Sequence, residues 1–213
     1  MAARLTLLLT ALWLSACAIA PSQPIQKIAL LAPFEGRYRD IGYNALYAAR
    51  MGITEADVPG VELLAVDDGG SALTAAERMR GLGQDPTVRM VIALGPQATA
   101  DALGSGELPV IIVGHWDQEA VVPEGVYVLS SPEIGDALTA GADHDLIALA
   151  EREAPFTAGD MAAIEAFSEL RQDRDGITIM SSGQLPDADF RERYLSSGDF
   201  VPEPGLLATL SYD

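Results

Sequence analysis

The chain has 213 residues, of which 49% are hydrophobic, and this is enough to bury a core in one large or two small domains. Its 31 acidic residues outnumber its 13 basic residues, so the formal net charge is −18 at pH 7. This charge argues against nucleic-acid binding, because neutralising phosphates requires a basic surface.

Residues 1–17 are predicted to be a lipoprotein signal peptide. Arg4 supplies the positive charge, and residues 5–14 form an apolar stretch too short to span a bilayer. The sequence Leu14-Ser15-Ala16-Cys17 resembles a bacterial lipobox, in which the cysteine is acylated and becomes the first mature residue. An ordinary secretory signal with an incidental cysteine is the alternative. Because Cys17 is the only cysteine, an internal disulfide or a multi-cysteine metal site is excluded.

Residues 18–26, AIAPSQPIQ, are predicted to be a mobile tether. The apolar runs that follow are short and have no polar face, as expected of strands covered on both sides. They are residues 28–32, 61–66, 88–94, 108–113 and 126–129. Helical spacing over residues 40–54, 71–82 and 97–103 places a helix after each of the first three runs, with Ser71 as a cap. This alternation predicts an α/β fold, a doubly wound parallel sheet with right-handed crossovers.

The common strand order 2-1-3-4-5 places a ligand crevice at the carboxyl ends of the first and third strands. The loops at 34–38 and 95–98 should therefore face each other, with the loop at 115–117 beside them. We predict that these loops line a site for a small polar solute with Phe34, Glu35, Tyr38, Gln97, His115 and Trp116. A plain strand-to-helix turn explains Gly95-Pro96-Gln97 about as well as an anion-binding helix terminus does.

The acidic pair Asp67-Asp68 also follows a predicted strand. A receiver-like phosphoacceptor or Mg²⁺ site is one interpretation. However, such a site needs a lysine near the end of the domain, and Lys27 is the only lysine. An acidic turn that caps the following helix is the favoured prediction.

Besides solute binding, a catalytic role is an alternative interpretation of the cluster His115, Trp116 and Asp117. The chain has no G-x-S-x-G nucleophile elbow and no free cysteine after lipidation. The only other histidine is His144, which argues against a metal centre. We therefore predict no enzyme activity, no cofactor and no metal, and the surface-loop alternative for this cluster stays open.

Beyond residue 131 the pattern changes. Residues 134–152 and 158–170 are alanine-rich and acidic with helical spacing, and residues 177–180 form a brief apolar run. A helix is predicted over 187–195, and a Pro- and Gly-containing turn at 201–205 precedes an apolar tail. Residues 27–131 thus form one α/β lobe, and 132–213 form a short helical part with a returning strand or helix.

These motifs together resemble the type I periplasmic-binding-protein family, in particular solute-binding lipoproteins related to branched-chain amino acid receptors. The resemblance rests on Pro33-Phe34-Glu35-Gly36, Val66-Asp67-Asp68-Gly69-Gly70 with the following helix, Val91 to Gly95, Leu108-Pro109-Val110-Ile111, and the late Phe190, Tyr194, Pro202 and Leu210-Ser211-Tyr212-Asp213. It covers residues 27–131 and 177–213. Glu35 and His115-Trp116 depart from the small hydroxyl residues that the family often has there. Residues 132–176 are too few for the family's second lobe, which implies a truncated or reduced relative.

The resemblance implies a membrane-anchored solute-binding lipoprotein of an ABC-type uptake system. Its partners would be a small, amino acid-like solute, a transporter permease and the membrane, and it would lie in the cell envelope, facing the periplasm or the exterior. An envelope assembly or regulatory lipoprotein that keeps the fold without a ligand is the alternative, and a flavodoxin-like hydrolase is a third. With one complete lobe, we expect weak solute binding, since much of a ligand's surface would stay in water.

Overall fold

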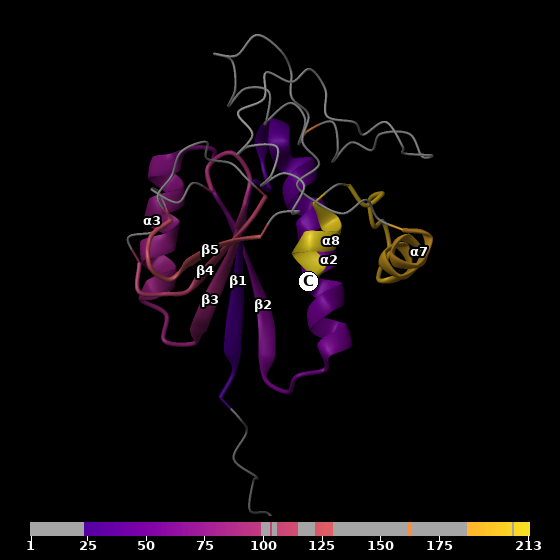
Figure 1. Cartoon of the computed structure of the whole chain (residues 1–213), viewed down its shortest axis with the longest axis horizontal. Coiled ribbons are helices and arrows are strands. Elements are labelled where there is room, and N and C mark those ends of the chain that lie inside the picture. Colours follow the sequence, from indigo (N-terminus) through magenta and orange to yellow (C-terminus); the bar gives the residue numbers. More distant parts are fainter. Residues whose placement is uncertain are drawn as a thin grey trace, which may run out of the picture.

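The computed structural model describes residues 24–98, 103, 106–114, 122–129, 162, 187–205 and 207–213. Its centre is a five-stranded sheet in the order β2-β1-β3-β4-β5, with every neighbouring pair parallel (Figure 1). The strands are β1 (Gln26–Ala32), β2 (Val61–Asp67), β3 (Val88–Leu94), β4 (Val110–Val113) and β5 (Val126–Leu129). The predicted fold class and strand order are confirmed.

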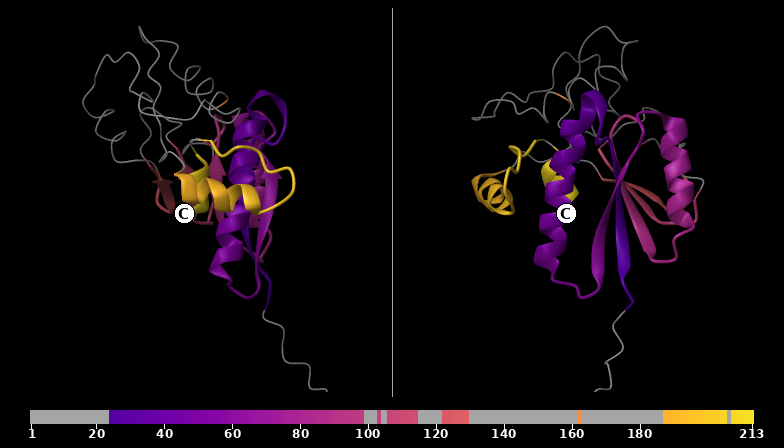
Figure 2. Two further views of the ribbon diagram at one scale, coloured as in Figure 1. Left: turned by 90° about the vertical axis from the view of Figure 1, so that its right-hand side faces the viewer. Right: turned by 180° about the vertical axis from the view of Figure 1, so that it is seen from behind.

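Strand β1 lies inside the sheet, between β2 and β3, and is covered on both faces. Its successive residues Leu30 and Leu31 point to opposite faces, and both are buried. On one side lies α3 (Ala72–Gly83), and on the other lies α2 (Arg39–Ala56), as Figures 1 and 2 show. This two-sided cover explains why the strands have apolar runs without alternation.

The helix boundaries follow local signals. The Ser71 side chain accepts a hydrogen bond from the Thr74 N–H at 3.1 Å, and so caps α3 as the sequence predicts. Helix α2 follows a short 3-10 turn, η1 (Gly36–Tyr38). It ends at Ala56 and is followed by the capping residue Asp57, which has a left-handed φ of 47°.

The C-terminal segment packs against α2. It contains α7 (Ala188–Ser196), which confirms the helix predicted there, and α8 (Ala208–Tyr212), which forms from the predicted apolar tail. A second apolar cluster joins α2 to this segment through Ala48, Met51, Phe190, Tyr194 and Ala208. The buried Tyr194 hydroxyl donates to the Asn44 carbonyl at 3.1 Å, and the Asn44 side chain accepts from the Gly205 N–H.

Two predicted boundaries shift. Strand β1 begins at Gln26, inside the predicted tether, because the Gln26 N–H donates to the Gly60 carbonyl at 2.7 Å. Strand β4 begins at Val110 rather than Leu108, since Pro109 has no N–H to give to a ladder.

Several predictions fall outside the described residues. These are the signal peptide with Cys17, most of the tether, the helices over 134–152 and 158–170, the strand over 177–180, and most of the helix over 97–103. In the part of the chain that the structure describes, no helix is long and apolar enough to cross a membrane.

Candidate ligand-binding site

The loop that follows β1 is held in place by a carboxylate at the end of β2. Asp67 Oδ2 accepts hydrogen bonds from the N–H groups of Phe34 at 2.7 Å and Glu35 at 3.1 Å. Its Oδ1 accepts from the Gly69 N–H at 2.8 Å. The parallel register pairs Ala32 with Asp67, which brings this side chain to the beginning of the loop. A charged acceptor with three donors therefore fixes the backbone at the switch point, the place between the carboxyl ends of β1 and β3 where the strand order reverses.

Two glycines let this loop pack tightly against its neighbours. A Cβ at Gly42 would lie 2.0 Å from the Pro33 carbonyl oxygen, so only glycine fits beneath the loop. Gly95, at the end of β3, has a φ of +107°, and a Cβ there would lie 2.8 Å from Pro33 Cδ. The loops after β1 and β3 thus lie side by side, as the strand order predicts.

Four of the six predicted ligand residues lie on these two loops. Phe34 is half-buried, with its ring centroid 5.8 Å from that of Tyr43 in an edge-on contact. Glu35 is exposed, Tyr38 is half-buried beneath the guanidinium of Arg37, and Gln97 is half-buried in the turn after β3. His115 and Trp116 lie outside the described residues, and ligand contact by all six stays a prediction.

Asp68 is buried, with 3% of its surface exposed. Its Oδ1 accepts from the Gly70 N–H at 2.8 Å, whereas its Oδ2 has no hydrogen-bond partner in the structure as described. Burial raises the pKa of this carboxyl, and the adjacent Asp67 raises it further, although the Gly70 N–H opposes the shift. Both acids thus accept hydrogen bonds from backbone N–H groups of nearby loops.

The prediction that this acidic turn caps the following helix is wrong. Ser71 caps α3, and Asp67 instead binds the loop after β1. Sequence reasoning missed this role because the contact joins residues 33 positions apart. The predicted strand order could have indicated this contact, because an acid at the carboxyl end of β2 lies beside the loop that follows β1.

Within the described residues, two cavities lie away from the loops after β1 and β3. One, of about 570 Å³, opens between α2 and α7. The other, of about 340 Å³, is an apolar groove on the sheet face beside α2 and α8. Neither is lined by the predicted ligand residues. Within the described ranges, no group of three His, Cys, Asp or Glu side chains is placed to hold a metal ion.

No known family model matches the sequence, and no curated protein matches it. Solved structures that match include solute-binding proteins. An ABC transporter substrate-binding protein from Sphaerobacter thermophilus is 18% identical, with a TM-score of 0.45 over 82% of this chain and 52% of that one. A possible leucine/isoleucine/valine-binding protein from Rhodopirellula baltica is 16% identical, with a TM-score of 0.47 over 87% and 56%.

A third match is a solute-binding protein from R. palustris in complex with benzoate, which is 19% identical with a TM-score of 0.44 over 79% of this chain and 51% of that one. The chain therefore spans about half the length of these solved structures. Because the TM-scores are low, the fold assignment rests on the strand order of the chain itself.

Proposed function

We propose that this protein is a membrane-anchored solute-binding lipoprotein of an ABC-type uptake system. Its ligand would be a small polar solute, amino acid-like in chemistry, bound beyond the carboxyl ends of β1 and β3. The observation that supports this proposal is the Asp67 clamp. Asp67 fixes the start of the loop at 33–38, and this loop lies beside the loop at 95–98, where open α/β sheets bind ligands.

The side chains on these loops suit binding rather than catalysis. Phe34 and Tyr38 offer aromatic surface, Glu35 offers an exposed carboxylate, and Gln97 offers an amide. Such a mixture of aromatic walls and a few polar groups is typical of small-molecule sites. Among these four described side chains, none is a serine, threonine or cysteine nucleophile of the kind that acyl transfer uses.

Glu35→Gln tests the site. Titration of the mature chain with branched-chain amino acids, amides and benzoate should change the fluorescence of Trp116, the one tryptophan left after removal of Trp13 with the signal. Glu35→Gln should weaken binding of a cationic or donor-rich solute about tenfold, because a charge-assisted hydrogen bond is lost. Glu62→Gln, on the exposed side of β2 and remote from these loops, is the matched control. Equal affinities for the two variants would contradict the placement of the site.

Cys17→Ser tests the anchor. The wild-type chain should partition into the membrane fraction and gain the mass of a diacylglyceryl group, whereas Cys17→Ser should be released as soluble protein, because acyl chains supply the membrane affinity. Fractionation and intact-mass measurement check this. Membrane association of both chains, with an unmodified mass for the wild type, would refute lipidation.

A further inference from the structure

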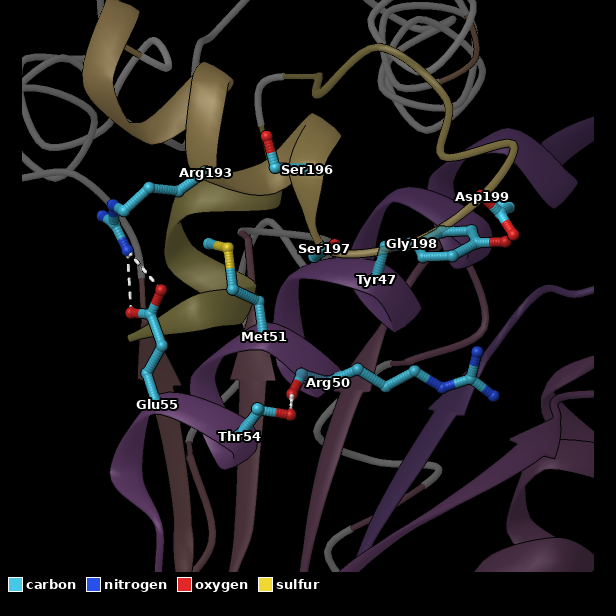
Figure 3. A pocket seen from close by; sticks show the side chains of 10 residues that line it. All are labelled: Tyr47, Arg50, Met51, Thr54, Glu55, Arg193, Ser196, Ser197, Gly198 and Asp199. Atoms are coloured by element: carbon cyan, nitrogen blue, oxygen red, sulfur yellow. Dashed lines mark hydrogen bonds and ion pairs between the residues drawn. The ribbon is translucent and has the colours of Figure 1, made fainter.

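The cavity of about 570 Å³ between α2 and α7 has a size typical of small-molecule sites (Figure 3). One wall is the outer face of α2, with Tyr47, Arg50 and Thr54 on successive turns. The other wall is the C-terminal end of α7 and the loop that follows, including Ser197 and Asp199. It lies apart from the switch-point loops and shares no residue with them.

One pair of opposite charges in this cavity is already satisfied. Arg193 Nη1 contacts both carboxylate oxygens of Glu55, at 2.8 and 2.7 Å, and the Tyr212 hydroxyl also donates to Glu55. In contrast, Arg50 and Asp199 form no ion pair within the described residues. In Figure 3 the Arg50 guanidinium lies on the opposite side of the view from the Arg193–Glu55 pair. The Arg50 guanidinium lies over the Tyr47 ring, 5.9 Å from its centroid, and this contact leaves its N–H groups without a carboxylate partner among the described residues. The cavity therefore presents one cation and one anion that are not paired with an opposite charge.

The hydroxyl groups of the cavity already donate to backbone carbonyls, so they can only accept from a ligand. The Thr54 hydroxyl donates a hydrogen bond to the Arg50 carbonyl at 2.8 Å. The Ser196 hydroxyl donates one to the Glu192 carbonyl at 2.8 Å, and the Ser197 hydroxyl donates one to the Tyr194 carbonyl at 2.7 Å. Their oxygen lone pairs remain available to a ligand. The end of α7 adds the partial negative charge of its last carbonyls. The α7 wall consequently favours a cationic donor, while Arg50 on the α2 wall favours an anion.

The loop at the cavity contains a non-glycine residue in the left-handed region. Phe200 has a left-handed φ of 61°, which is unusual for a bulky residue, and its side chain is 100% exposed. Its neighbour Asp199 lines the cavity. Strain of this kind is concentrated at sites where the backbone position serves function.

We propose that this cavity is a second small-molecule site, which takes a zwitterion such as an α-amino acid. The ligand carboxylate pairs with Arg50, and its ammonium group lies between Asp199 and the carbonyl end of α7. A simple carboxylic acid would leave Asp199 without a partner, and a simple amine would leave Arg50 without one. The site selects molecules that carry both charges, and it does so independently of the switch-point site.

Amide shifts of the ¹⁵N-labelled mature chain, titrated with glycine to about 50 mM, test this proposal, since a ligand this small binds weakly. Glycine should shift the amides of residues 47–55 and 196–199, whereas acetate and methylammonium at equal concentration should not. Arg50→Gln and Asp199→Asn should each weaken glycine binding about tenfold, because each removes one charge-assisted contact. Arg39→Gln is the matched control, since Arg39 is an exposed arginine of α2 outside the cavity.

An absence of shifts at these residues would overturn the proposal. So would equal affinities for Arg50→Gln and Arg39→Gln, or acetate binding as tightly as glycine. Shifts confined to residues 33–38 and 95–98 would support the switch-point site and refute this one, so the two proposals fail separately. Arg50 and Asp199 are both exposed, and urea unfolding of each variant should match the wild type.

Discussion

Replacing Tyr194 with alanine is expected to lower the free energy of unfolding by about 4 kcal/mol, the range found when a large aromatic side chain is removed from a core. Tyr194 is 0% exposed, and its ring centroid lies 5.9 Å from that of Phe190 and 6.5 Å from that of Tyr47. Its hydroxyl also donates to the Asn44 carbonyl. The loss should therefore release α7 from α2, and urea unfolding of the mature chain measures it.

One further variant separates the hydrogen bond of Tyr194 from the packing of its ring, and a second variant is an exposed control. Tyr194→Phe removes only the hydrogen bond and should cost about 1 kcal/mol. Tyr127→Ala removes an aromatic ring that is 62% exposed on β5, and it should change the free energy of unfolding by less than about 1 kcal/mol. If Tyr194→Ala were no more destabilising than Tyr127→Ala, the docking of α7 on α2 would be wrong.

Asp67→Ala should release the loop after β1 and cost about 3 kcal/mol of stability, because it removes the charged acceptor of three backbone N–H groups. Hydrogen exchange of the Phe34 and Glu35 amides should accelerate about a hundredfold, since these N–H groups lose their partner. The solute binding that we propose at the loops after β1 and β3 should be lost with the same variant.

Asp67→Asn provides a graded comparison. An asparagine keeps one carbonyl oxygen, so it can accept some of these bonds without the charge, and its effect should be smaller than that of Asp67→Ala. Glu62→Ala is the control, because Glu62 is exposed on the same strand. Unchanged exchange of the Phe34 and Glu35 amides in Asp67→Ala would show that another group holds the loop.

Local sequence patterns were sufficient to predict the strands and the cap of α3. The apolar runs end at Pro33, Asp67 and Gly95, and burial on both faces of a parallel sheet requires such continuous runs. Ser71 was identified as a helix cap because its hydroxyl needs only a partner three residues away. Such features depend on neighbours within one or two turns, so they can be read without the fold.

The tertiary structure alone decided the contacts between distant elements. Asp67 reaches Phe34 because the register of β1 and β2 pairs Ala32 with Asp67, and no local pattern reports that register. Tyr194 reaches Asn44 across 150 positions of the chain, and this contact brings α7 to α2 and creates the cavity that contains Arg50 and Asp199. Hydrophobic periodicity shows which face of an element is buried, but the partner of a polar side chain depends on how separate elements pack.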